Sequence, residues 1–578
     1  MKTIRFLLAT AALGAAVLPL AGCNDFLKKN PAGVVSSPDL NTPANIEGMV
    51  TAAYAGLGND FWIYPYSSPW PYGDLRSGDA YKGGGGTGDV NEYNDLEHFT
   101  LVQPTLGPFD QMFYQLYVGI GRANDALRRL DAVSTTTMPD KVTRQAEMRF
   151  VRGHFYFILK ELFNRVPWID ENLDVNQYPK VSNVAISNDS LWSNIAADFR
   201  FAAANLPNNQ GPNLGGDEGR ANKYAAEAYL AKVQLFRAYV QNDAHQVTSI
   251  DQSKLQDVLT LTADVMTGPY ALTADFGDSF QFATEKNSEA IFKIMMSQSD
   301  GTPNGRVDMG NGLNYTMTKA YGCCWFHIPS QNLINAFRTD AAGLPLLTTY
   351  NQTSLVDSAS FQNNTVDPRL DYTVGIVGHP FKADPTFVFD SSWTRTPQVY
   401  GAHSSMKELQ DPSCGCVVKV GPFFASSKDI EVIRYADVLL MRAEALIELG
   451  RQAEALPLIN QIRTRAAAST TKLKYANGTP ISNYKIQPYS GAGWTQDYAR
   501  QALRFERRLE FAMEGRRFFD LVRWGIAAPT VNAYLTVEQT RHDYLQGSLF
   551  TAGRDEYLPI PQNQINFTQG LYVQNPGY

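Results

Sequence analysis

Residues 506–525 read ERRLEFAMEGRRFFDLVRWG, and the interpretation of the chain starts from this stretch. Glu506, Glu510 and Glu514 recur every four residues among several arginines. Side chains four residues apart lie on one face of an α-helix, so we expect ion pairs along that face, each contributing a few tenths of a kcal/mol. The stretch therefore predicts the end of a long helix that runs from about Thr495 to Trp524.

Upstream segments also carry apolar residues at helical spacing. These stripes cover 109–130, 148–162, 191–206 and 224–235, and short polar connections between them favour antiparallel helix pairs. Within 435–462, small residues at 443, 450 and 455 alternate with larger ones, as in a tetratricopeptide repeat. Gly450 suits the left-handed turn between two such helices. Thr42 and Pro43 are typical of a helix start, and that helix would end near Leu57.

Two long segments, 58–108 and about 268–430, lack this period. Within the second, 290–296 and 372–377 read as short strands, and Ser330 is placed to cap a brief helix that ends near Arg338. The sequence thus predicts a mainly α fold, in which a helical-repeat scaffold carries a large irregular half with short β-strands. Variable loops on a rigid scaffold commonly form a binding site.

The amino terminus has the anatomy of an export signal. Lys2 and Arg5 precede an apolar run over 6–20, and Leu20-Ala21-Gly22-Cys23 resembles a bacterial lipobox. We predict a signal peptide over 1–22, acylation of the Cys23 thiol and an extended tether over 23–42. A soluble exported protein with an incidental cysteine is the alternative. No later run reaches 18 apolar residues, so the rest of the chain is predicted not to span a membrane.

The other four cysteines are clustered, as Cys323-Cys324 and Cys414-Gly415-Cys416. In an oxidising compartment they indicate disulfides, for which three pairings are open. Free thiols or a zinc site are the alternatives, although the usual C-x-x-C spacing is absent. A disulfide between the adjacent Cys323 and Cys324 would itself offer a rigid apolar contact. The seven histidines include no pair four residues apart, so no metal site is predicted.

Aromatic residues make up 12% of the chain and charged residues only 19%, with a net charge of −7. This composition disfavours a nucleic-acid partner, which requires a basic surface. Tyr and Trp are dense over 61–81 and 321–327, where rings for stacking on sugars and polar groups for their hydroxyls occur together. Trp393 is a further candidate ring. The predicted ligand-binding residues are Trp70, Tyr72, Asp74, Arg76, Tyr321 and Trp325.

Several motifs along the chain resemble those of the SusD/RagB family. Besides 506–525, they are RYADVLLMRAEA at 434–445, YLPIPQ at 557–562, QNPGY at 574–578 and CNDFL at 23–27. The resemblance implies four tetratricopeptide-like helix pairs that support a less regular ligand-binding half. It also implies one domain over 43–578, with an N-terminal part over about 43–240 and a C-terminal part over about 285–578.

Members of that family are lipoproteins of the outer membrane that have no catalytic activity. The resemblance implies that this chain captures nutrients, most often oligosaccharides, as the lid of a SusC-like TonB-dependent transporter. Of the residues directly after Cys23, over 24–29, only Asp25 is acidic. The family often has a short acidic run there, which acts as a surface-export signal.

Two other functions remain open from the sequence. The same machinery in the RagB branch captures peptides. A surface glycoside hydrolase would need two carboxylates at a defined separation. No cofactor is predicted, and bound Ca²⁺ is left open. The carboxylates available for a hydrolase in the first aromatic segment are Asp74, Asp79, Asp89 and Glu92.

Overall fold

The computed structural model describes residues 39–578 except 215–216 and 303–304. The predicted signal peptide, Cys23 and most of the predicted tether lie outside the described residues. Each predicted helical stripe lies in a helix of the structure. These helices are α2 (Pro43–Ala55), α4 (Gly107–Asp131), α5 (Lys141–Phe163), α6 (Asn188–Asn205), α7 (Lys223–Ala238), α13 (Tyr435–Glu448) and α14 (Gln452–Ala468).

One scaffold helix, α8 (Gln252–Val265), was missed by the sequence analysis. Its signal was present, because Asp251 caps the first turn and the buried Leu255, Val258, Leu259 and Val265 follow helical spacing. It packs between α7 and α13 and so links the two helical parts of the sequence.

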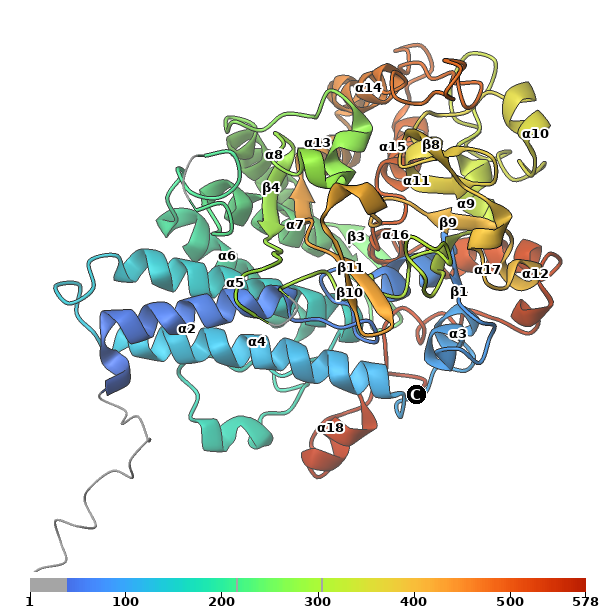
Figure 1. Ribbon diagram of the computed structural model, residues 1–578. Coiled ribbons are helices and arrows are strands. Elements are labelled where there is room, and N and C mark those ends of the chain that lie inside the picture. The colour runs from blue at the N-terminus through green and yellow to red at the C-terminus, as the bar shows by residue number, and fades with distance from the viewer. Residues whose placement is uncertain (1–38, 215–216, 303–304) are drawn as a thin grey trace, which may run out of the picture.

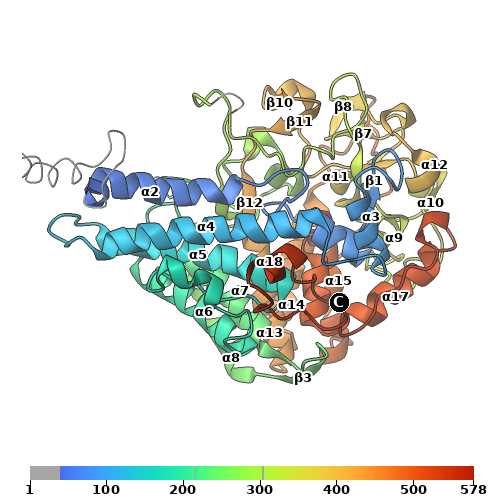
Figure 2. The ribbon, with the colours of Figure 1, turned by 90° about the horizontal axis from the view of Figure 1, so that it is seen from below.

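The scaffold helices lie side by side in the order α2, α4, α5, α6, α7, α8 and α13, with α14 and α15 (Gln496–Glu510) beyond (Figures 1 and 2). The 25 residues of α4 extend about 37 Å. The nine-residue link to α5 is too short to return to the start of α4, so the two helices run antiparallel. The fold is therefore mainly α, as predicted. One cluster of buried apolar side chains extends from Ile46 to Tyr572 and includes both parts of the chain.

The predicted long helix over 495–524 is interrupted. Residues 511–516 form turns between α15 and α16 (Arg517–Arg523), and Met513 and Gly515 have positive φ angles of 61° and 69°. A left-handed residue ends a helix because it redirects the backbone. A π-helical turn, Pro71–Leu75, crosses this break so closely that a Cβ on Gly73 would lie 1.9 Å from the Gly515 carbonyl oxygen. The periodicity alone did not reveal this crossing.

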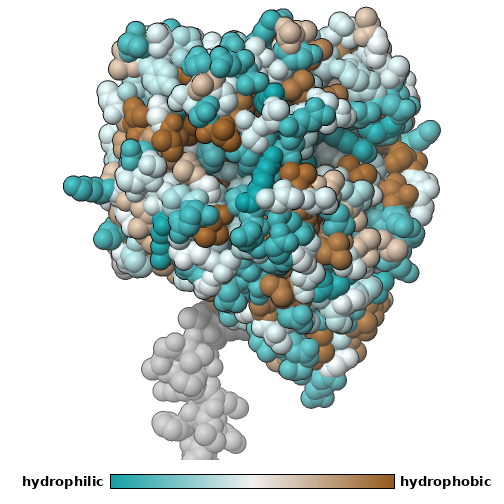
Figure 3. All heavy atoms as spheres, turned by 90° about the vertical axis from the view of Figure 1, so that its right-hand side faces the viewer, coloured by the Kyte–Doolittle hydropathy of each residue, from teal (hydrophilic) through white to brown (hydrophobic). Residues whose placement is uncertain are grey.

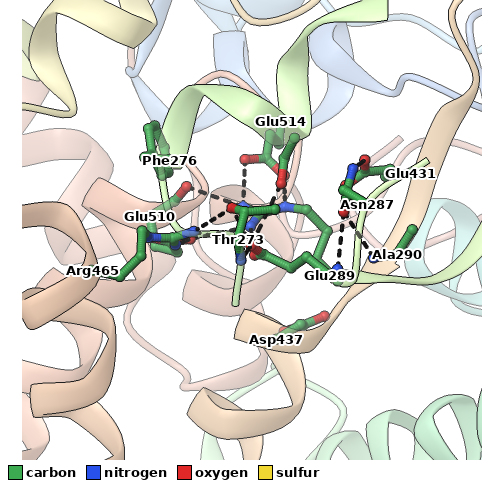
Figure 4. A network of polar contacts seen from close by, with 12 residues as sticks. Thr273, Phe276, Asn287, Glu289, Ala290, Glu431, Asp437, Arg465, Glu510 and Glu514 are labelled. Carbon is green, nitrogen blue, oxygen red and sulfur yellow. Dashed lines mark hydrogen bonds and ion pairs between the residues drawn. The ribbon is translucent and has the colours of Figure 1, made fainter. Parts of the chain in front are cut away.

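The charged residues of this helix face do form ion pairs, but most of their partners differ from the predicted ones. Glu506 and Glu510 are fully buried and the Glu514 side chain is 14% exposed, and they pair mainly with basic residues of other elements. Figure 4 shows Glu510 and Glu514 in this network. The arginines of the same stretch likewise pair with Asp79, Asp437 and Asp520. The glutamate contacts are Glu506 with Arg369 and Arg463, Glu510 with Arg369, Arg434 and Arg465, and Glu514 with Lys407, with Arg434 and, at 3.9 Å, with Arg516 of the same stretch.

Short antiparallel strand pairs occur throughout the less regular half. Pair β1–β5 aligns Tyr81 with Ile328 and so joins the two irregular segments. The pairs are β1 (Ala80–Gly83) with β5 (Phe326–Pro329), β2 (Tyr239–Gln241) with β3 (Val247–Ile250), β4 (Ala290–Ile294) with β12 (Ile430–Arg434), β6 (Val374–Ile376) with β9 (His403–Ser405), β7 (Pro380–Phe381) with β8 (Asp384–Val388), and β10 (Val417–Val420) with β11 (Phe423–Ser426).

The expected strands over 290–296 and 372–377 correspond to β4 and β6, and Ser330 caps a short helix as predicted, accepting a hydrogen bond from the Leu333 amide. Among the described residues, no helix is long and apolar enough to cross a membrane. The remaining short helices are α3 (Asn91–His98), α9 (Gln331–Ala336), α10 (Ser358–Asn363), α11 (Leu370–Thr373), α12 (Pro397–Tyr400), α17 (Ala527–Glu538) and α18 (Gln562–Phe567).

Candidate ligand-binding surface

The six residues predicted to contact a ligand are buried. None is more than 2% exposed, so no ring among them presents a face to solvent. Trp325 donates its indole N–H to the His403 carbonyl at 2.8 Å, and the Tyr321 hydroxyl bonds to the Gln410 carbonyl. The Arg76 guanidinium lies 4.0 Å over the Phe518 ring. The Tyr72 hydroxyl has no partner among the described residues. We assign these side chains to the support of the surface rather than to the surface itself.

The two predicted segments do meet, at His327. Trp70 stacks on the His327 ring at 4.8 Å, and the Nε2 of this histidine lies 3.0 Å from Asp74. Its Nδ1 lies 2.7 Å from Glu408. The nearby Glu408 and the hydrogen bonds to both carboxyls outweigh burial and raise the pKa of His327 to about 9. The buried His327 imidazolium therefore joins the first irregular segment, through Asp74, to the second, through Glu408.

Partly exposed rings lie above this support. Phe61, Trp62 and Tyr64 come from the first predicted segment, and Phe423 comes from the tip of the β10–β11 hairpin. The Trp62 and Phe423 ring centroids are 5.3 Å apart, and Phe61 lies 5.6 Å from Trp62. These four rings form the first aromatic group.

The second aromatic group is built from Phe387, Trp393 and Phe424. Phe387 and Trp393 lie 4.5 Å apart, and both Phe387 and Phe424 rest against the buried Tyr321. Trp393 was a sequence candidate, but Phe387, Phe423 and Phe424 were missed. Their signal was weak, since each is an isolated ring or ring pair beside turn residues such as the Gly-Pro at 421–422.

The β10–β11 hairpin separates the two groups. Val420 pairs with Phe423 across a two-residue turn, so Phe423 and Phe424 are neighbours near its tip. Successive strand residues point to opposite faces, which agrees with Phe423 contacting Trp62 and Phe424 contacting Tyr321. A hairpin with a ring on each face can contact a ligand that extends past its tip.

Hydrogen-bonding groups border the second aromatic group. Asp390, Ser391 and Ser392 are exposed immediately before Trp393, and Arg395 follows and pairs with Asp89 at 2.6 Å. The Met317 amide donates to the Trp393 carbonyl at 2.8 Å, which fixes the second group to the 316–324 loop. Carboxylate, guanidinium and hydroxyl groups beside aromatic rings can form hydrogen bonds with the hydroxyls of a polyol ligand.

Two buried carboxyls lie beneath the first aromatic group. Burial, reinforced by the nearby Asp308, raises the pKa of Asp60 to about 7, and burial raises that of Asp308 to about 6. Asp60 accepts a hydrogen bond from the Ser67 amide at 3.1 Å, and Asp308 accepts one from the Asn311 side chain at 2.7 Å. At neutral pH the Asp60 carboxyl is therefore partly protonated, whereas Asp308 is mostly ionised.

Among the described residues, no group of three or more histidine, cysteine, aspartate or glutamate side chains is arranged to hold a metal ion. Three of the four carboxylates considered for hydrolysis, all but Glu92, have structural partners. Asp74 pairs with His327, Asp79 with Arg508 and Arg517, and Asp89 with Arg395.

The four cysteines whose pairing the sequence left open are joined in the structure as Cys323–Cys324 and Cys414–Cys416.

The face at the right-hand side of Figure 1, where α12 and α17 lie, carries apolar side chains in small patches separated by polar ones (Figure 3).

A repeat scaffold that presents a loop-built aromatic surface defines a class of binding proteins. Residues 288–578 match the model of the SusD family, and the chain belongs to this family. It is 25% identical over 574 residues to SusD-like protein P2 of Formosa agariphila, covering 97% of this chain and 98% of the relative. It is 23% identical to the starch-binding protein SusD of Bacteroides thetaiotaomicron, covering 84% and 82%. A solved laminarin-binding SusD-like protein is 24% identical, with a TM-score of 0.57 over 91% of this chain and 99% of that one.

Proposed function

We propose that this chain captures an uncharged glycan on its two aromatic groups without catalysing a reaction. The observation that carries the proposal is the assembly of seven partly exposed rings from three separate loop segments around one hairpin. Aromatic faces bury large apolar area with few rotamers to immobilise, which suits the C–H faces of sugars. Starch and laminarin, named for two relatives, are both neutral glucans.

We also propose that the bound glycan passes to a SusC-like TonB-dependent transporter, with the chain held at the outer membrane, at the cell surface, by acylated Cys23 and acting as one domain over 43–578. Membership of the family supports this part of the proposal. Peptide capture, the RagB alternative, would favour main-chain hydrogen bonding and side-chain pockets over stacked rings.

Calorimetric titration with malto-, laminari- and xylogluco-oligosaccharides tests the binding function. Trp62→Ala and Trp393→Ala each remove one ring and are expected to weaken binding about tenfold, or about 1.4 kcal/mol. Phe567→Ala is the matched control, because Phe567 is 68% exposed on α18, outside both groups. Its affinity is expected to match the parent chain. Unchanged binding in both tryptophan variants would remove the aromatic groups from the site.

Two further measurements separate the alternatives. Titration with peptides of five to ten residues is expected to give no heat, and saturable peptide binding in place of saccharide binding would favour the RagB function. Incubation with the matching polysaccharides is expected to release no new reducing ends. Their release by the purified chain would contradict a binding-only role.

A further inference from the structure

The Cys323–Cys324 disulfide lies at the surface of the second aromatic group. Cys323 is partly exposed, Gly322 is exposed and Cys324 is 5% exposed. The Phe424 ring lies 3.5 Å from the position a Cβ would take on Gly322. Neither the proposed glycan contacts nor the support residues give this disulfide a role.

The loop that carries the disulfide is fixed from beneath. The Gly322 amide donates to the Thr316 carbonyl at 3.1 Å, the Cys324 amide to Leu313 at 3.3 Å and the Trp325 amide to Tyr315 at 2.7 Å. Tyr321 and Trp325 anchor their buried rings on either side, through the Gln410 and His403 carbonyls. The disulfide closes a small ring between the adjacent residues Cys323 and Cys324, so these side chains have no rotamers left to lose when a ligand binds. The exposed edge is therefore preorganised for contact with a ligand.

The surroundings of this edge are mainly apolar and hydrogen-bonding, and Lys419 on β10 lies 5.9 Å from the centroid of the neighbouring Phe424 ring. Met317, 37% exposed, bonds through its amide to the Trp393 carbonyl, which places the loop beside that ring. Sulfur atoms are polarizable and pack well against C–H groups. Lys319 is the charged side chain of the described loop 316–324. A flat, uncharged ring with hydroxyls at its edge fits this combination better than an extended peptide.

We propose that the Cys323–Cys324 disulfide is itself a ligand contact, packing against the C–H face of a pyranose ring in the bound glycan. The inference deepens the proposed function and rests on it. It assigns the rigid, partly exposed sulfur edge to the ligand, with Phe424 and Trp393 as the neighbouring rings.

The test uses the full chain and whichever oligosaccharide of the panel the parent chain binds. The double variant Cys323→Ser/Cys324→Ser is expected to lose at least tenfold in affinity. Cys414→Ser/Cys416→Ser is the matched control, since it removes the other short-range disulfide, with Cys414 partly exposed and Cys416 buried, and its affinity is expected to stay within twofold. Alkylation without reduction, read by mass spectrometry, verifies which thiols are bonded in each protein.

A second measurement needs no substitution. A phosphine reductant attacks an exposed sulfur, so saturating oligosaccharide is expected to slow reduction of Cys323–Cys324 at least fivefold and to leave that of Cys414–Cys416 unchanged. Equal reduction rates with and without oligosaccharide overturn the inference, as does full affinity in a folded Cys323→Ser/Cys324→Ser variant. A parent chain that binds no saccharide overturns the proposed function itself, and the two failures are thereby distinguished.

Discussion

His327 contacts Asp74, 253 residues earlier in the chain, on one side and Glu408, 81 residues later, on the other. Burial raises the pKa of Asp74, whereas His327 lowers that of Glu408 against the effect of burial. Glu408 is therefore the ionised partner, and the imidazolium belongs to the folded state. Below the aromatic surface, one proton thus helps to hold the loops in place.

This arrangement predicts a specific pH dependence of stability. The pKa of His327 is about 9 in the folded chain and near 6.5 in an unfolded one. A raised pKa gives stability that is fully present below pH 6.5 and is lost as the pH rises through 9, on the order of 3 kcal/mol in total. Urea unfolding of the parent chain at pH 6, 7.5 and 9.5 is expected to show this decline.

The control for that measurement is the difference between variants, because other buried groups also titrate in this range. His327→Gln is expected to be less stable than the parent at pH 6 and to approach it at pH 9.5. His98→Gln, at a partly exposed histidine on α3, is expected to show no such convergence. A constant difference between His327→Gln and the parent at all three pH values would contradict the assignment.

At the scale of elements, the break between α15 and α16 explains the position of the first irregular segment. The turn Pro71–Leu75 crosses the break with almost no space between the two backbones. Gly73→Ala is expected to cost about 1–3 kcal/mol of unfolding free energy, because its Cβ would overlap the Gly515 carbonyl. Gly48→Ala on α2, with nothing within 4 Å, is the matched control and is expected to be neutral or slightly stabilising. Equal urea midpoints for the two variants would argue against the close crossing.

Glu510 shows what the ion pairs of this element do. The arginines 369, 434 and 465 hold the pKa of its carboxyl well below the usual range despite full burial. Glu510→Gln leaves those guanidinium groups short of a counter-charge, and we expect a loss of about 3–5 kcal/mol in urea unfolding. Glu454→Gln removes an exposed pair with Arg451 and is expected to leave the urea midpoint nearly unchanged. Similar losses in both variants would contradict a buried network.

The sequence predicted elements better than it predicted contacts. Periodicity located the scaffold helices other than α8, because one buried face per helix leaves a local pattern. It failed for Glu510 and for Trp70, since local spacing does not reveal which distant element covers a side chain. The same limit applies to the site. The aromatic segment 61–81 was recognised, but Phe61 and Trp62 are partly exposed while Trp70 and Tyr72 are buried, a distinction made by residues such as His327 far along the chain.

At the scale of the whole molecule, the proposed ligand surface and the proposed anchor at Cys23 are separate parts of one chain. Cys23 precedes α2 by about twenty residues, which reach at most roughly 65 Å when fully extended. The β10–β11 hairpin that carries Phe423 and Phe424 lies in the loop half, whereas α2 begins the helical scaffold (Figure 2). Because Cys23 is proposed to serve only as the anchor, Cys23→Ala is expected to move the chain from the membrane fraction to the soluble fraction and to leave oligosaccharide affinity within twofold.

Membrane fractionation and calorimetry on the same preparations check this separation. Trp393→Ala is the reciprocal control, expected to stay in the membrane fraction while its affinity falls. When the parent chain is extracted in mild detergent, a TonB-dependent transporter is expected to stay bound in stoichiometric amount. Trp393→Ala is expected to keep this complex, because docking on the transporter and stacking on the sugar would use different surfaces. A membrane-bound Cys23→Ala variant would place the anchor elsewhere. Loss of the transporter from Trp393→Ala would make the aromatic surface part of the docking interface rather than a site reserved for the ligand.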